Sequence, residues 1–189
     1  MSLPGWDYFL SIESDLDRCS RFVHFSEENY ETYSIEFARI IMASSSEFDT
    51  IVKNICKSIA PSESPSNITE YYPILMTKYP QFTSFAISIP KYNLTIRPWN
   101  DWTTESRPDW WSKGYNKIKH ERDNNFEQAN LKNALSSVTG LLVGLLYLYK
   151  ETIGTPTKIQ FYRAPKLLET DSYSVYADGN VWWKLETPD

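Results

Sequence analysis

Hydrophobic side chains recur at three- and four-residue intervals along most of the chain. The first such segment runs from Trp6 to about Val23, with acidic residues between its apolar positions Phe9, Ile12, Leu16 and Cys19. This spacing places the apolar side chains on one face of an α-helix. The chain therefore opens with a predicted amphipathic helix.

A second periodic segment is longer, and its apolar positions are Tyr33, Phe37, Ile40, Ile41, Phe48, Ile51, Val52, Ile55 and Ile59. It predicts a helix of about 30 residues that ends at Pro61, because proline cannot continue the helical hydrogen-bond ladder. The serine run 44–46 is expected to bend it, since serine hydroxyls compete for backbone hydrogen bonds. A shorter third helix, capped by Asn67 or Thr69, is expected to end near Pro80.

The period then changes from helical spacing to alternation. Residues 83–97 alternate apolar and polar positions and predict a small hairpin laid over the helices. The connection that follows contains Pro98 and Pro108 and four tryptophans, which either pack against the bundle or line a ligand cleft: Trp99, Trp102, Trp110 and Trp111. Packing is the preferred interpretation, because large aromatic side chains mostly supply core contacts.

Two further helices are predicted. One begins near Pro108 or Asp109 and is interrupted by the turn-forming run 123–125, and the other runs from Phe126 to about Ile153. Nearly every residue from 138 to 149 is apolar or small, which predicts a buried spine. That span is shorter than the roughly 20 residues that cross a bilayer, so no membrane segment is predicted. Gly140 and Gly144 are expected to let another helix backbone approach closely.

The predicted fold class is mainly α, a bundle of about five helices with a small β-hairpin insertion and a short β-rich C-terminal tail. Residues 1–155 form the bundle, with the hairpin near 83–97. Residues 156–189 form the tail, which contains a predicted hairpin that turns at Asp178 and Gly179 and is expected to pack on the bundle.

Composition narrows the function. A net charge of −5 opposes bulk attraction to nucleic acid, so any RNA contact must be local. The two cysteines, Cys19 and Cys56, lie far apart without ligand-spaced partners, which predicts reduced thiols and no metal site. The N-terminal segment lacks the pattern of a secretion signal, so the predicted location is cytoplasmic. No cofactor motif is present.

The most informative stretch is 110–150. At about 100° per residue, an arc of roughly 120° holds a polar stripe of Lys113, Asn116, Lys117, His120 and Asp123. Residues 112–122 contain Lys113, Lys117, Lys119 and Arg122 against one acid, Glu121, a net of +3. Such a patch is either a solvated face or a local anion-binding surface.

An all-helical core with a polar patch built on Asn116 and His120 resembles the HEPN superfamily of small helical bundles, in a bacterial branch. The resemblance covers about residues 6–153. It rests on WWSKGYNKIKHER, on the helix that follows, and on YSIEFARIIMASSSEFDTIVKNIC. It implies a homodimer that cuts RNA without metal, in a defence or toxin-type system.

The family pattern maps onto two residues of this chain. Its histidine corresponds to His120 and its polar residue to Asn116, which would act as the acid or base and as the orienting group. Lys113 or Lys117 would balance the developing negative charge, and Lys119 and Arg122 would contact RNA. The arginine of the pattern has no counterpart, since Arg122 follows His120 by two residues and is expected on another side of the helix.

Two functions remain open at this point. One is RNA binding or metal-independent ribonuclease activity. The other is a noncatalytic helical module that dimerises or binds a protein or nucleotide. His120 and the stripe around it are functional in the first, and in the second they form a solvated face. The oligomeric state discriminates, because a strictly monomeric chain would count against a paired cleft and a dimeric scaffold alike.

Overall fold

A computed structural model of the chain describes residues 3–153, 158–161, 163–170 and 181–184. Within these residues the protein is mainly helical, and each of its two small sheets is a pair of antiparallel strands. The helices are α1 Trp6–Cys19, α2 Ile35–Ile59, α3 Ile68–Lys78, α4 Asn116–Glu121 and α5 Leu131–Ile153. The strands are β1 Ile87–Ile89, β2 Leu94–Ile96, β3 Lys158–Phe161 and β4 Val181–Lys184. The predicted mainly helical class with a small hairpin is confirmed.

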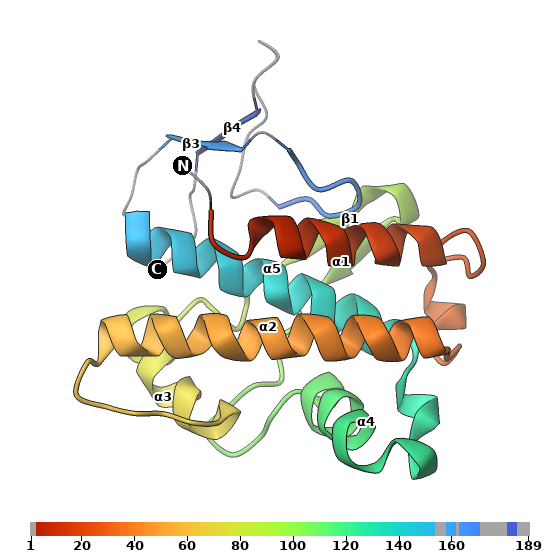
Figure 1. Cartoon of the computed structure of the whole chain (residues 1–189), viewed down its shortest axis with the longest axis horizontal. Helices are drawn as coiled ribbons and strands as arrows, with labels where there is room; N and C mark the ends of the chain where they lie inside the picture. The colour runs from red at the N-terminus through yellow and green to blue at the C-terminus, as the bar shows by residue number, and fades with distance from the viewer. Residues whose placement is uncertain (1–2, 154–157, 162, 171–180, 185–189) are drawn as a thin grey trace.

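Helix α5 is the centre of the bundle. It lies behind α1 and α2, with α3 and α4 on the other side of α2 from α1 (Figure 1). Every residue from Asn133 to Tyr149 is buried, so the predicted spine is confirmed. Two of its fully buried polar residues are satisfied locally: Ser137 donates to the Ala134 carbonyl over 2.9 Å and Thr139 to the Leu135 carbonyl over 2.8 Å.

The length argument against a membrane span does not hold for α5. At 23 residues, it is the one helix among those described that is long and apolar enough to cross a membrane. Of its most apolar window, 94% is buried inside the protein, as in the core helix of a soluble bundle. Burial within the bundle, rather than shortness, now supports the predicted absence of a membrane segment.

The helix ends follow from capping side chains. Helix α2 begins at Ile35, because the Ser34 hydroxyl accepts a hydrogen bond from the Phe37 N–H over 3.1 Å. It is 25 residues long and stops two residues before Pro61. Asn67, not Thr69, caps α3: its side-chain oxygen accepts from the N–H groups of residues 69 and 70. The observed ends of α2 and α3 thus match the capping and proline signals.

The tryptophan-rich connection packs against α2 and α5. Its four indoles are at most 5% exposed, and Trp99 lies at their centre, stacked on Phe48 of α2 with ring centroids 4.2 Å apart. The Trp99 indole donates to the Gly140 carbonyl over 3.3 Å. A side chain at Gly140 would meet Trp99 and Trp110 at 3.1 Å. The prediction that another helix backbone approaches Gly140 is therefore wrong, because indole rings occupy the space beside this glycine.

The C-terminal segment 163–170 lies against α1 and the first hairpin. The Trp6 indole donates to the Arg163 carbonyl over 3.1 Å, and Ser88 and Glu169 form an antiparallel bridge. Leu167 and Leu168 are buried. Strand β3 pairs with β4 in an antiparallel register, while the predicted turn at 178–179 lies outside the described residues.

Glu13 fastens this segment to α1. It is 2% exposed, and one of its carboxylate oxygens accepts from the Leu167 N–H over 2.7 Å and from the Leu168 N–H over 3.4 Å. Burial raises the pKa of Glu13, and the hydrogen bonds from backbone N–H groups only partly offset this. Glu13 is thus a buried acceptor whose negative charge is unfavourable.

Two substitutions of Glu13 separate the effect of its acceptor oxygen on stability from the effect of its charge. Because its folded-state pKa is raised, the stabilisation from Glu13 is complete below the unfolded value and is lost as pH rises through the folded value. Glu13→Gln keeps an acceptor oxygen and should be at least as stable as the parent at pH 8. Glu13→Leu leaves two buried N–H groups unpaired and should cost about 1–3 kcal/mol. Urea unfolding at pH 5 and pH 8 measures both, and equal losses in the two variants would contradict this role.

Candidate functional site

The polar stripe predicted around His120 lies on a π-helix, Trp110–Tyr115, followed by the single short helix α4. The structure therefore corrects the prediction of one regular helix from residue 108 or 109. Trp110, Trp111, Gly114 and Tyr115 face inward, because the wider π turn brings them to one side. Gly114 lies close to α5: a Cβ atom there would lie 3.1 Å from the Asn133 side chain, which would have to shift slightly.

His120 and Asn116 lie one turn apart on α4 and face solvent. His120 is exposed and Asn116 is half-buried. Among the described residues, neither side chain has a hydrogen-bond or ion-pair partner, and neither lines one of the pockets described below. The pair is accessible to a ligand, but one chain alone builds no cleft around it.

The three lysines of residues 112–122 each contact a nearby residue. Lys113 pairs with Asp109 over 2.9 Å and Lys117 with Glu121 over 2.8 Å, each one helical turn away. Lys119 lies over the Tyr115 ring, 5.3 Å from its centroid. The hydrogen bond from Lys117 lowers the pKa of the Glu121 carboxyl. Each of these three lysines therefore has a local partner, although the two ion pairs are exposed and screened by solvent.

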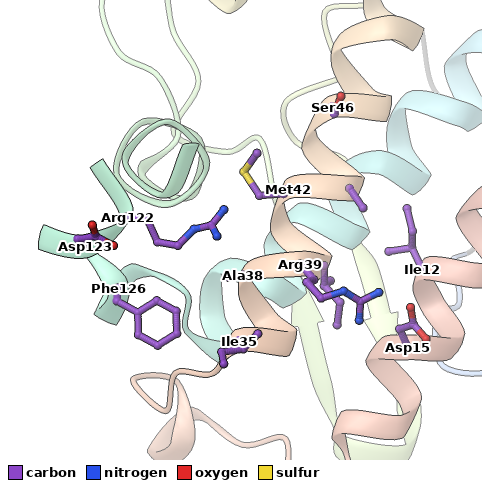
Figure 2. Close-up of a pocket in the computed structure, with 12 residues that line it drawn as sticks. Ile12, Asp15, Ile35, Ala38, Arg39, Met42, Ser46, Arg122, Asp123 and Phe126 are labelled. Carbon is purple, nitrogen blue, oxygen red and sulfur yellow. The ribbon is translucent and has the colours of Figure 1, made fainter. Parts of the chain in front are cut away.

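Arg122 behaves differently from the lysines. The backbone leaves the α-helix at Glu121, whose φ is −141°, and Arg122 begins a short 3-10 turn, Arg122–Asn124. Its side chain extends toward Met42 of α2 (Figure 2). Within the part of the chain that the structure describes, its guanidinium has no hydrogen bond or ion pair. Arg122 thus lies just beyond the end of α4 and borders a surface that His120 does not line, in agreement with the expectation that the two point to different sides.

Arg122 borders a groove of about 970 Å³ that runs along α2, which we call the α2 groove. Helix α2 forms its floor, α1 one wall and residues 122–126 the other (Figure 2). The floor residues recur at helical spacing along one side of α2: Ile35, Ala38, Arg39, Met42, Ala43 and Ser46. Ile12 and Phe126 supply the apolar parts of the walls, so the lining is more apolar than polar.

The groove leaves apolar surface in water. Ile35, at the start of α2, is 70% exposed, and Tyr33 beside it is 53% exposed. The Tyr33 ring packs edge-on against Phe126, with centroids 5.7 Å apart, which extends the apolar rim. The sequence contained little signal for this surface, because only Ile35 is exposed: Ala38, on the same side of α2, is buried in the core and Met42 is half-buried.

The described cysteine and histidine side chains give little support for a nucleophile or a metal site. Cys56 is buried, and burial raises the pKa of its thiol to about 12, so it carries no thiolate near neutral pH. His24 is exposed and its ring packs on Tyr92, 5.5 Å between centroids. Within the described ranges, no three His, Cys, Asp or Glu side chains are arranged to hold a metal ion.

Comparison with known proteins identifies no relative. The chain matches no protein-family model, no curated protein and no solved structure. The fold and the site therefore define its class on their own: a mainly helical protein with an open, largely apolar groove along its second helix. Its resemblance to the HEPN superfamily stays a prediction.

Proposed function

We propose that this protein is a helical interaction module that binds an amphipathic helix of a protein partner in the α2 groove. The observation that carries the proposal is the largely apolar groove along α2, at one end of which Ile35 and Tyr33 are 70% and 53% exposed. An exposed apolar surface bordered by polar residues is typical of interaction sites.

The shape of the groove favours a helix over an extended strand. Its floor is one face of α2, and no free sheet edge lines it, so a partner strand would find no backbone groups to pair with. Ala38 and Ala43 are small, which allows a partner helix to lie close to α2 between the two walls. Apolar residues of the partner at positions i, i+3 and i+7 would then cover Ile35 and Met42.

Arg122 is expected to make the α2 groove favour a negatively charged group on the partner. Its guanidinium reaches over the groove without a partner in the described residues, whereas Arg39 is paired with Glu36 and Asp15 with Arg18. A carboxylate on the partner helix would form a charge-assisted hydrogen bond with Arg122. The partner is therefore an amphipathic helix that carries an acidic residue beside its apolar face.

A selection from a displayed library of helical peptides tests the proposal. The expected peptides have an apolar face and an acidic residue, and they lose binding to Met42→Lys. Arg122→Glu should reverse the preference, so that selected peptides carry lysine or arginine at that position. Lys117→Glu, which changes a paired lysine on α4, should leave the selection unchanged. The proposal fails if no peptide family emerges, or if Lys117→Glu changes the preference as much as Arg122→Glu does.

A second candidate function rests on the accessibility of Asn116 and His120. Both are free to meet a ligand, which supports RNA binding or metal-independent ribonuclease activity of the HEPN type in a defence or toxin-type system. His120 would act as acid or base, Asn116 would orient it or the phosphate, and Lys113 or Lys117 would balance charge. Pairing of two chains would be needed to enclose the site.

RNA binding and cleavage assays decide the second candidate. His120→Ala should abolish cleavage, while the matched variant His24→Ala should retain it. Light scattering should show a dimer under the same conditions. A strictly monomeric chain, or equal activity in the two histidine variants, would exclude this function.

A further inference from the structure

A separate polar pocket of about 370 Å³ lies where four segments meet near the start of α5. Its walls come from residues 30–31, from the end of β2, from residues 101–113 and from the first turns of α5. It is distinct from the α2 groove and shares no lining residue with it. Its size suits a small molecule or the end of a chain, not a helix.

The floor of this polar pocket holds buried polar groups with unused donors. Asn130 is 5% exposed, and its oxygen accepts from the Asn133 N–H over 3.0 Å, while its amide nitrogen has no partner among the described residues. The hydroxyl of Ser136, which is 9% exposed, likewise has none there. By contrast, the Asn133 amide already donates to the Gln128 carbonyl over 2.8 Å. Neither donor atom is among the fully buried side-chain atoms that lack a partner, so both are reached from the pocket, and Asn130 and Ser136 are available to a bound group.

Cations from three segments line the pocket: Arg97 after β2, Lys113 in the π-helix and Lys132 in the first turn of α5. Lys113 pairs with Asp109, whereas Arg97 and Lys132 form no ion pair within the described ranges. The positive end of the α5 dipole lies here as well. Three carboxylates, Glu31, Asp101 and Asp109, also line the pocket; they equal the three cations in number, and all six residues are exposed, so the buried floor decides the preference.

These features favour an oxyanion over a cation. The floor offers an amide N–H and a hydroxyl and no carboxylate, and no metal-binding group of side chains occurs in the described part of the chain. A phosphate monoester presents three acceptor oxygens, which match a planar arginine fork, an ammonium and neutral donors together.

We propose that the polar pocket binds a phosphate monoester, with Arg97 and Lys132 contacting the phosphate and Asn130 and Ser136 donating from the floor. The inference does not rest on the α2 groove. The phosphate has two potential sources, a free small phosphate ester or the phosphorylated end of an RNA strand, and the same donors would serve either.

Calorimetric titration distinguishes the sources. The probes are glycerol phosphate, succinate as a carboxylate of similar charge, and a short RNA oligonucleotide with and without a 5′-phosphate. Saturable 1:1 binding of glycerol phosphate identifies a free ester. Binding only of the 5′-phosphorylated RNA identifies a strand end. Succinate binding as tight as that of the phosphate compounds overturns the proposal, as does the absence of binding by any of them.

Matched variants locate the binding. Ser136→Ala and Arg97→Gln should each weaken affinity roughly tenfold or more, since each removes a hydrogen bond to a charged group. Ser137→Ala is the control, because its hydroxyl is already bonded to the Ala134 carbonyl within α5. Alanine favours the helix, so both serine variants should fold, as circular dichroism would verify. Equal affinity of Ser136→Ala and Ser137→Ala would overturn the assignment.

Discussion

Replacing Trp99 by alanine is expected to lower the free energy of unfolding by about 3–5 kcal/mol, the usual cost of removing a fully buried aromatic side chain. Trp99 is 0% exposed and contacts Phe48 of α2 and the indoles of Trp102 and Trp110. The space left by the indole would be a cavity bordered by α2, α5 and the π-helix, so contacts to all three would be lost. Urea unfolding followed by circular dichroism measures the loss.

A pair of phenylalanine variants separates the hydrogen bond from the packing. The Trp99 indole donates to the Gly140 carbonyl, whereas the buried Trp102 indole N–H has no partner in the structure described. Trp99→Phe therefore loses a hydrogen bond as well as ring volume, while Trp102→Phe removes an unsatisfied donor. Trp99→Phe should be the more destabilising by about 1 kcal/mol. Equal losses in the two variants would show that the hydrogen bond contributes nothing beyond packing, and a larger loss for Trp102→Phe would contradict the prediction.

The helical core was predictable because its signals are local. The apolar spacing, the cap at Asn67 and the stop before Pro61 each depend on neighbouring residues, and the structure follows all three. The π-helix was not predictable in this way. It buries the adjacent indoles of Trp110 and Trp111, but adjacent buried residues also occur in the regular helix α2, so apolar spacing does not distinguish the two kinds of helix.

The candidate sites were harder to predict because they depend on contacts between distant segments. The α2 groove exists only because α1 and residues 122–126 flank α2, and the polar pocket joins residues 30, 97, 113 and 136. Charge counting along residues 112–122 suggested one basic patch. The structure instead divides it: Lys117 is paired on α4, Arg122 borders the groove, and Lys113 lines the polar pocket. Sequence proximity therefore did not predict a shared surface.

Glu151 is expected to have the second largest effect on stability, because it joins three helices. Its side chain is 5% exposed and accepts from Lys78 of α3 over 2.8 Å, from the Ser58 hydroxyl of α2 over 2.8 Å, and from the Tyr79 hydroxyl. Burial raises the pKa of this carboxyl, and the hydrogen bonds from Lys78, Tyr79 and Ser58 together lower it by more, so that the net pKa is lowered.

Glu151→Gln should destabilise the protein by about 2–3 kcal/mol at pH 7, at or below the lower limit of the roughly 3–5 kcal/mol that breaking a buried ion pair usually costs, because Lys78 remains half-exposed. A lowered folded-state pKa means that the stabilisation is present above the unfolded value of 4.5 and is lost as pH falls through the folded value. The difference between parent and variant should therefore shrink below pH 4. Glu13 contributes pH dependence of the opposite sign, since its pKa is raised.

Unfolding curves at pH 7 and pH 3.5 test this, with Glu127→Gln as a control on an exposed carboxylate that has no partner among the described residues. The control should change stability by less than about 0.5 kcal/mol at either pH. If Glu151→Gln lost as much stability at pH 3.5 as at pH 7, the effect would come from packing rather than from the charged acceptor. A loss confined to neutral pH would instead establish that one ionised carboxylate fixes the ends of α2, α3 and α5 together.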